Sequence, residues 1–272
     1  SVNPVLDPSA PGEKEIAQYV GAAMETIGAE VRYHEPRPGR VSVVARLRGS
    51  RPGRSLMLNA HADTVDVAGV DAPFSGEIRD GRLYGRGAFD MKGGLAAMMG
   101  AVKALAGAGC PHGGEILLAA VADEEYASLG TEDLVTRYRP DAAIVTEPTA
   151  LDICLAHKGF AWFEVTTKGR AAHGSRFDLG VDANMRMGRV LAGLDELEQD
   201  LRARTPHPLV GPPSLHAATL AGGSGLSTYA ASCRVQIERR TNPRENRGAV
   251  TAEIRQLLRR QVERDPSFEA DF

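Results

Sequence analysis

The chain lacks the features that mark secreted, membrane-spanning or nucleic-acid-binding proteins. Its three cysteines, Cys110, Cys154 and Cys233, lie far apart without CxxC spacing, so neither a disulfide framework nor a zinc-thiolate site is indicated. A net charge of -3 and the absence of a basic run argue against a nucleic-acid partner. No stretch approaches the roughly 18 apolar residues of a membrane span, and residues 1–15 do not resemble a signal peptide. These absences favour a cytoplasmic location.

The composition and the order of elements indicate an α/β protein with two domains. With 43% apolar and 25% charged residues, a chain of 272 residues can bury a normal core and divide into two domains. Up to about residue 150, strands alternate with helices. Helical periodicity covers 13–27, 92–106 and 131–138, and β-rich runs cover 41–47, 55–59, 115–122 and 142–145. Because these strands are apolar on both faces, we expect a mostly parallel sheet with helices on both faces.

The second half has a different pattern. Strands are predicted over 160–168, 214–221, 232–240 and 267–272, and long helices over 181–204 and 244–262. This β-α-β-β-α-β order is that of a split βαβ, ferredoxin-like layer. We place the boundary near His157–Gly159, which gives domains of 1–157 and 158–272.

Acidic and imidazole side chains follow the apolar runs of the first half, where predicted strands end. Strand ends of an open α/β sheet converge on one crevice, so residues far apart in sequence can meet there. The residues concerned are His61, Asp63, Asp90, Glu124, Glu125 and Glu147. Because imidazole and carboxylate groups are typical zinc ligands, the pattern predicts a metal site.

The local context of these residues suggests how they divide the chemistry. Asp63 can accept a hydrogen bond from the second imidazole nitrogen of His61 and so fix its tautomer. Asp90 lies in a glycine-rich turn just before a helix. Glu124 and Glu125 point in different directions, so one can bind a metal while the other holds a water for metal-assisted hydrolysis. Taken singly, each feature has an ordinary structural explanation: a solvated pair, a helix cap or a hydrogen-bonded His–Asp pair. The combination favours function.

Five strings follow one another along the chain: HADTVDV, GRGAFDMKGGLAA, DEE, TEPT and GRAAHGSRFDLGVDA. Together they resemble the M20 family of metallohydrolases, which includes acetylornithine deacetylase, succinyl-diaminopimelate desuccinylase, aminoacylase and carboxypeptidase G2. The resemblance covers essentially the whole chain. It implies a zinc-peptidase-like catalytic domain and a ferredoxin-like lid domain that joins two subunits into a homodimer.

The resemblance also implies a site for two zinc ions, with cobalt or manganese as alternatives. His61 and Glu147 would bind one ion, Asp90 would bridge both, and Glu125 would bind the second. Family members continue beyond the lid and there supply a last histidine to the second ion. Because this chain ends at Phe272, we expect its second metal site to be incomplete. The contexts of the remaining histidines do not suggest a replacement; these are His34, His112, His157, His207 and His216.

Four further roles follow from the resemblance. Glu124 would be the general base, Asp63 would clamp His61, and His173 would stabilise the oxyanion in the neighbouring subunit. Arg240 would receive a substrate carboxylate, for which the planar guanidinium is suited. Alternation along 232–240 places Arg240 on the polar face of its strand, whereas Arg239 shares the apolar face and is expected to be structural.

The chain departs from the family pattern in the loop after its glycine pair. Ser227 and Ala230 stand where the family usually carries Asn and Pro, so that loop's substrate contact is in question.

The sequence therefore predicts metal-dependent hydrolysis of the amide bond of a small N-acyl amino acid, as in the deacetylase and desuccinylase group. A dipeptidase or carboxypeptidase would share every catalytic residue named here. A third hypothesis is a non-catalytic dimerisation or binding module, because the second metal site is incomplete. We expect neither a nucleic-acid nor a membrane partner.

Overall fold

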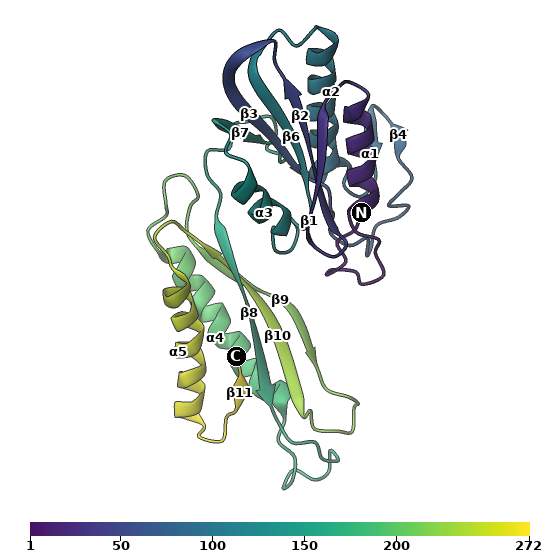
Figure 1. Ribbon diagram of the computed structural model, residues 1–272. Helices are drawn as coiled ribbons and strands as arrows, with labels where there is room; N and C mark the ends of the chain where they lie inside the picture. Colours follow the sequence, from purple (N-terminus) through teal and green to yellow (C-terminus); the bar gives the residue numbers. More distant parts are fainter. The chain divides into compact units, whose positions relative to one another are not determined.

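The computed structural model describes residues 1–272, which form two compact units, Ser1–Asp152 and Ile153–Phe272 (Figure 1). The boundary predicted from the sequence lies between residues 157 and 158. Each unit has its own sheet and its own hydrophobic core. None of the helices is both long enough and apolar enough to cross a membrane.

The first unit is built around one five-stranded sheet and three helices. Its helices are α1 (Lys14–Glu25), α2 (Gly93–Gly107) and α3 (Leu129–Arg137), and a short irregular turn, η1 (Ala88–Lys92), precedes α2. The sheet strands are β1 (Glu30–Arg37), β2 (Arg40–Arg48), β3 (Arg51–His61), β6 (Gly113–Val121) and β7 (Ala142–Val145). A separate hairpin is formed by β4 (Glu77–Arg79) and β5 (Arg82–Tyr84).

The central sheet is mixed, and the expectation of a mostly parallel sheet was wrong. The strand order is β1-β2-β6-β3-β7. β3 pairs in parallel with β6 and β7, but β2 is antiparallel to both β1 and β6. The reason is a hairpin: the chain turns back at Gly39, where φ is 79°, and so adds two antiparallel pairings at one side of the sheet.

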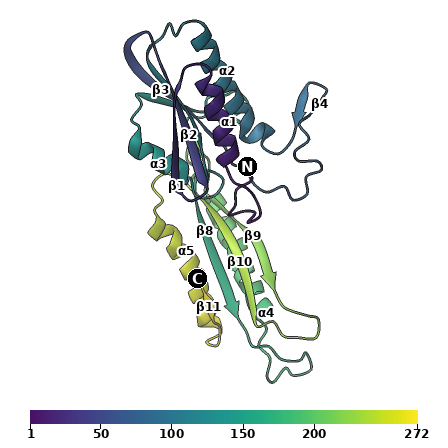
Figure 2. The same ribbon diagram turned by 45° about the vertical axis from the view of Figure 1, so that its right-hand side comes forward.

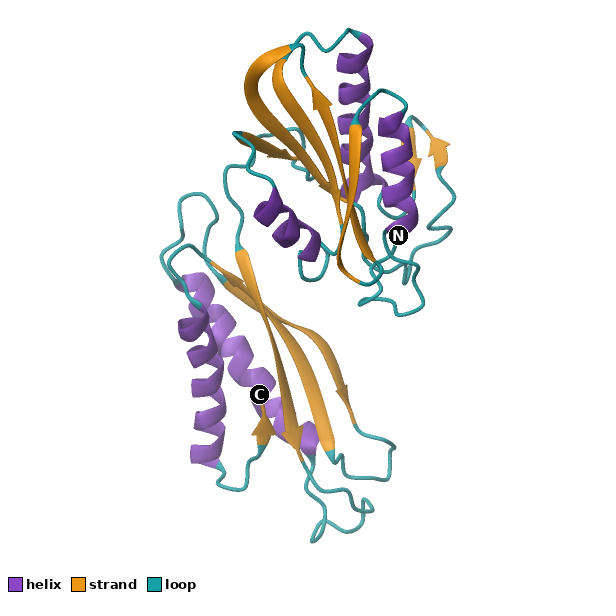
Figure 3. Cartoon of the chain, viewed as in Figure 1, coloured by secondary structure: helices purple, strands orange, loops and turns teal.

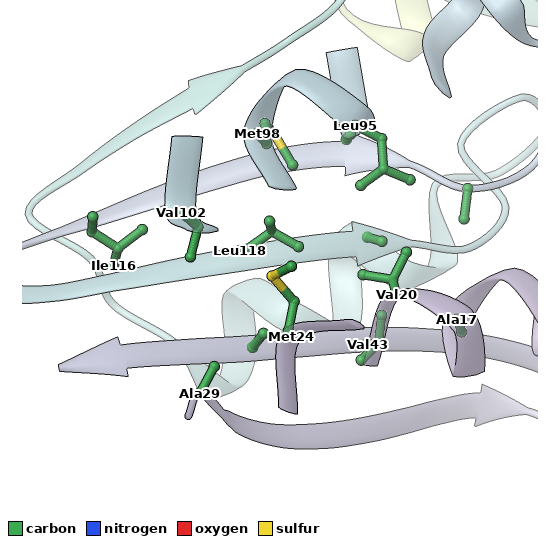
Figure 4. Close-up of a cluster of buried hydrophobic side chains, with 14 of the residues drawn as sticks. Ala17, Val20, Met24, Ala29, Val43, Leu95, Met98, Val102, Ile116 and Leu118 are labelled. Carbon is green, nitrogen blue, oxygen red and sulfur yellow. The ribbon is translucent and has the colours of Figure 1, made fainter. Parts of the chain in front are cut away.

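Alternating residues of β6 fill two hydrophobic layers, one on each face of the sheet. Ile116 and Leu118 pack with α1 and α2, whereas Leu117 and Ala119 face the opposite layer, which contains Leu134 of α3. Figure 4 shows the first layer, where apolar side chains of the two helices point toward the strands: Val20, Met24, Leu95, Met98 and Val102. Helices therefore cover both faces of the sheet, as its two-sided apolar strands predicted.

β7 lies at the edge of the sheet, and its prediction as a buried strand was wrong. All four of its residues are exposed, with Ile144 51% and Val145 59% accessible. The strand has a neighbour on one side only, β3, so its apolar sequence does not by itself ensure burial.

The second unit has one sheet with two long helices packed on it (Figures 2 and 3). Its elements, in β-α-β-β-α-β order as predicted, are β8 (Gly159–Lys168), α4 (Ala183–Ala203), β9 (Ser214–Gly222), β10 (Ser232–Thr241), α5 (Arg247–Arg264) and β11 (Ala270–Asp271). The antiparallel sheet has the order β11-β8-β10-β9. Asp182 and Asn246 cap the two helices by accepting hydrogen bonds from backbone N–H groups of the first turn.

Candidate metal centre

Three parallel strands deliver their ends to one edge of the first sheet. His61 is the last residue of β3 and pairs with Val121, the last residue of β6, while Val145 ends β7 opposite Asn59. Just past these ends come Glu124 with Glu125, and then Glu147. The parallel register thus explains why residues distant in sequence share one site.

Asp90 reaches the same place through the turn η1. Gly87 opens this turn with φ 79°, and a Cβ atom there would lie 2.7 Å from Thr64 Cγ2, so the position requires glycine. The Asp90–Met91 peptide bond is cis. The buried Met91 Sδ accepts a hydrogen bond from the His61 backbone N–H at 3.2 Å, which ties the turn to the end of β3.

The His61 imidazole lies at the buried side of the cluster, and the carboxylates lie between it and solvent. Its Nε2 lies 2.9 Å from Asp90 Oδ1, 3.6 Å from Glu147 Oε1 and 3.8 Å from Glu124 Oε2. The imidazole is 1% exposed, whereas the Asp90, Glu124 and Glu147 side chains are 53%, 43% and 37% exposed. A cation entering from solvent would therefore meet the carboxylates before the imidazole.

The five predicted ligand and base residues fall into two groups that share the imidazole. One group is His61, Glu124 and Glu147, and the other is His61, Asp90 and Glu125; within each group the ligand atoms lie within 4.8 Å of one another. One nitrogen and several carboxylate oxygens suit zinc, cobalt or manganese. Glu124, the expected base, is grouped with potential ligands, so the division of roles within the Glu124–Glu125 pair stays a prediction.

We expected the Asp63 side chain to orient His61. The backbone carbonyl of Asp63 does so instead. His61 Nδ1 lies 2.9 Å from the carbonyl oxygen of Asp63 and 3.6 Å from its carboxylate. A carbonyl can only accept, so Nδ1 donates and Nε2 faces the cluster. The Asp63 carboxylate instead accepts hydrogen bonds from the backbone N–H groups of Glu124 and Glu125, at 3.1 and 3.2 Å. It thereby holds the pair that carries the predicted chemistry.

The electrostatics of the cluster favour bound protons when no cation is present. Burial, reinforced by the charge of Asp90, raises the pKa of Glu125 to about 7, and burial also raises the pKa of Glu147. Burial alone would lower the pKa of His61, but surrounding carboxylates, Asp63 foremost, outweigh it and raise that pKa. A divalent ion would displace these protons, so its affinity should fall as the pH falls.

A buried group of polar side chains next to the cluster was not predicted. Asn3, Glu13, Arg40 and Asp123 are each at most 7% exposed and are joined by hydrogen bonds and ion pairs, and Asn3 also donates to Asp63. Burial raises the pKa of Glu13 to about 7, although Arg40 opposes this shift. Nothing in the local sequence of Glu13 signalled this environment, because its partners lie in other elements.

The pKa of Glu13 predicts how stability depends on pH. A carboxyl whose pKa rises from 4.5 to about 7 on folding holds a proton that the unfolded chain has lost, so unfolding free energy falls as the pH rises through this range. Glutamine does not titrate, so the unfolding free energy of Glu13→Gln should not show this decrease. Measured by thermal or denaturant unfolding, the unfolding free energy of the variant minus that of the parent should therefore rise by about 2–3 kcal/mol from pH 5 to pH 8. The exposed Glu15→Gln is the matched control. A parent–variant difference that does not change with pH would contradict this prediction.

The remaining predicted site residues lie in the second unit. Arg240 is exposed on the polar face of β10, 3.0 Å from Glu238 and over the Phe160 ring. Arg239, as expected from alternation, faces inward, is 0% exposed, and forms ion pairs with Glu245 and Glu253 at 2.6 and 3.1 Å.

His173 is exposed in the loop between β8 and α4. Its Nδ1 accepts from the Ser175 backbone N–H at 3.3 Å, which places the proton of a neutral imidazole on Nε2.

Comparison with known proteins identifies the family. The model of peptidase family M20/M25/M40 matches residues 57–271, which is most of the chain. The chain belongs to this family. A Bacillus subtilis N-formyl-4-amino-5-aminomethyl-2-methylpyrimidine deformylase is 29% identical over 95% of the chain and 65% of its own length. A Myxococcus xanthus acetylornithine deacetylase is 32% identical over 86% of the chain and 62% of its own length. The M20 chain thus spans about two thirds of the length of these relatives.

Solved structures show the same fold at low sequence identity. An M20 family metallo-carboxypeptidase from Sulfolobus solfataricus aligns with a TM-score of 0.75 and 18% identity, over 95% of this chain and 72% of that one. Human carnosine dipeptidase 1 aligns with a TM-score of 0.73 and 19% identity, over 97% and 73%. These likenesses support the mixed α/β architecture of this M20 member.

Proposed function

We propose that the protein containing this chain hydrolyses the amide bond of a small N-acyl amino acid in a metal-dependent reaction. The observation that carries the proposal is the cluster at the strand ends, where one buried imidazole and four carboxylates meet. An M20 deacetylase from Myxococcus xanthus and a probable desuccinylase from Staphylococcus epidermidis, 34% identical over 63% of this chain, are relatives whose names fit this reaction.

The residues fit a divalent ion of the zinc type. His61, Asp90 and Glu147 would hold one ion, since His61 Nε2 lies 2.9 Å from Asp90 Oδ1 and 3.6 Å from Glu147 Oε1, and Asp90 with Glu125 would contribute to a second. This division of roles differs from the two distance groups, which join Glu147 to Glu124 and Asp90 to Glu125. An ion there would supply Lewis acidity, which would polarise the amide carbonyl and lower the pKa of water. The first set has three protein ligands, as catalytic zinc sites do. The second lacks an imidazole of its own, because both groups use His61.

Glu124 is proposed to move the proton. Its carboxylate lies beside the imidazole, and its backbone is held by Asp63, so its oxygen can take a proton from water at the cluster. The oxygen of that water bonds to the amide carbonyl carbon, and the same carboxyl then donates the proton to the leaving amine nitrogen as the C–N bond breaks. The products are a carboxylate and a free amino acid.

Two residues of the second unit are proposed to bind the substrate. The Arg240 guanidinium is accessible on its strand and can receive the carboxylate of the amino acid in a bidentate manner. His173 carries a donor Nε2–H in an exposed loop and is proposed to stabilise the oxyanion in a neighbouring subunit. A dipeptide also has a free carboxylate next to its amide bond, so a dipeptidase or carboxypeptidase uses the same residues.

A substrate screen tests the proposed function. Metal-loaded protein would be assayed against N-acetyl and N-succinyl amino acids and against dipeptides, with the Glu124→Gln variant as the blank. We expect turnover of N-acyl amino acids that exceeds turnover of dipeptides. Preference for dipeptides would assign the protein to the peptidases. Zinc binding without hydrolysis of any of these amides would favour the non-catalytic module.

We further propose a two-fold homodimer that forms through residues 158–272 in the cytoplasm. β9 is an edge strand with Leu220 57% exposed, and such an edge can pair with a second copy. If His173 acts across the dimer, each site needs both chains. Heterodimers of a His173→Ala chain and a Glu124→Gln chain should then regain about half of parental activity, because one of their two sites has both residues. Verified heterodimers without any recovery would exclude the role in trans.

A further inference from the structure

Two buried carboxylates lie directly behind the Glu124–Glu125 pair. Asp63 is 0% exposed and its two oxygens accept the backbone N–H groups of both glutamates. Asp123, which is 1% exposed, precedes the pair and has a left-handed backbone with φ 66°. The direction in which the pair leaves β6 therefore depends on how these two carboxylates are held.

The side chain of Asn3 joins the two carboxylates. Its Nδ2 donates to Asp63 Oδ2 at 2.7 Å and to Asp123 Oδ1 at 3.0 Å. Its Oδ1 accepts from the Val5 backbone N–H and from Arg40 Nη1, both at 3.0 Å. Every donor and acceptor site of this fully buried amide is therefore used, and the two donors to Oδ1 fix which way the amide faces.

Arg40 holds the other side of this arrangement. Its Nη1 donates to Asn3, while Nη2 lies 2.7 Å from Asp123 Oδ1 and 2.6 Å from Glu13 Oε1. The side chain of Arg40 is only 8% exposed, so these buried acidic side chains, and not water, surround its guanidinium. The two terminal nitrogens of the guanidinium are essential to this geometry, because one donates to the Asn3 amide and the other contacts Asp123 and Glu13.

We propose that Asn3 and Arg40 are positioning residues for the metal and proton-transfer site. They orient the carboxylates of Asp63 and Asp123, which in turn fix the backbone of Glu124 and Glu125. This inference rests on the proposed function of that pair. Neither residue belongs to the groups that can hold an ion, so both act through other residues. An outer-sphere contribution of this kind typically changes metal affinity or activity by about 10–100-fold.

The primary test replaces Asn3 by leucine, which has a similar shape but no hydrogen-bonding groups. The matched control is Val2→Ala, which shortens a buried neighbour of the same segment without altering a contact to either carboxylate. Zinc affinity would be measured by competition with a chromophoric chelator, and the geometry of the bound ion by the visible spectrum of the cobalt-loaded chain. Circular dichroism melts would establish that each variant is folded.

We expect Asn3→Leu to bind zinc about 10–100-fold more weakly, with an altered cobalt spectrum, and Val2→Ala to match the parent in both. Arg40→Lys keeps the positive charge but lacks the second branch, so it should show the same change to a smaller extent. It also provides the test if Asn3→Leu does not fold. Where turnover is measurable, kcat should fall while KM changes little.

Zinc affinities of Asn3→Leu and Arg40→Lys within about twofold of the parent, with an unchanged cobalt spectrum, would overturn the proposal. An equal loss in Val2→Ala would overturn it as well, since the effect would then reflect packing. The titration requires no substrate. Failure of the proposed function would instead appear as a zinc-loaded parent that hydrolyses none of the amides. That outcome does not depend on the zinc affinities of the variants.

Discussion

Glu124→Gln should reduce turnover by about 10²–10⁴-fold while the zinc content of the protein stays unchanged. Glutamine preserves the size of the side chain and its ability to hydrogen-bond, but it cannot take a proton from water. The backbone N–H of residue 124 would still donate to Asp63, so the turn that carries Glu125 should keep its shape. The loss should therefore fall on kcat, with the ion still bound.

The check is a kinetic assay together with metal analysis of the dialysed protein. Glu132→Gln in the first turn of α3 makes the same chemical change at an exposed position and should behave as the parent does. If Glu124→Gln loses zinc as well as activity, Glu124 is a ligand. Glu125 would then be the candidate base, and the grouping of Glu124 with His61 and Glu147 would describe one metal site.

His61→Asn should remove both metal binding and turnover. The imidazole belongs to both ligand groups, and it is held with Nε2 toward the cluster by the Asp63 carbonyl. Without it, the site has carboxylates alone, which hold zinc weakly. We expect a loss of zinc affinity greater than the roughly 100-fold upper end for residues outside the ligand set.

His34→Asn is the control for this variant. His34 lies in the same unit but contacts Tyr138, with its Nε2 2.9 Å from the hydroxyl oxygen, and it belongs to neither ligand group. Zinc titrations of both variants, with melting curves to compare their stability, separate loss of a ligand from loss of the fold. Parental zinc affinity in folded His61→Asn would mean that the ion binds elsewhere.

The fold was predictable where apolar pattern and burial coincide. The runs that became β2 and β6 are largely buried, and both were recognised from the sequence. β1, whose residues EVRYHEPR are mostly polar, was missed because its stability comes from pairing with β2 and not from its own apolar pattern. β7 was recognised as a strand, but its exposure depends on its place in the sheet, which local sequence does not encode.

The residues of the cluster were predictable because each carries a local signal. His61 ends a strand, Glu125 and Glu147 follow strands, and strand ends in parallel sheets converge. Asn3 and Arg40 had no such signal: Asn3 binds carboxylates 60 and 120 positions away, and Arg40 binds Asn3 across 37 positions. Likewise, the choice of His61 Nδ1 between the carbonyl and the carboxylate of Asp63 depends on side-chain geometry, which motif spacing does not specify.

The most direct test of the account is an equilibrium zinc titration of the 272-residue chain with calorimetric detection of released protons. Because both ligand groups share His61, we predict one tightly bound ion per chain, with protons released near pH 7 from His61 and Glu125. Any second ion should bind much more weakly. A chain that shows no saturable zinc binding would contradict the assignment of this cluster as a metal centre.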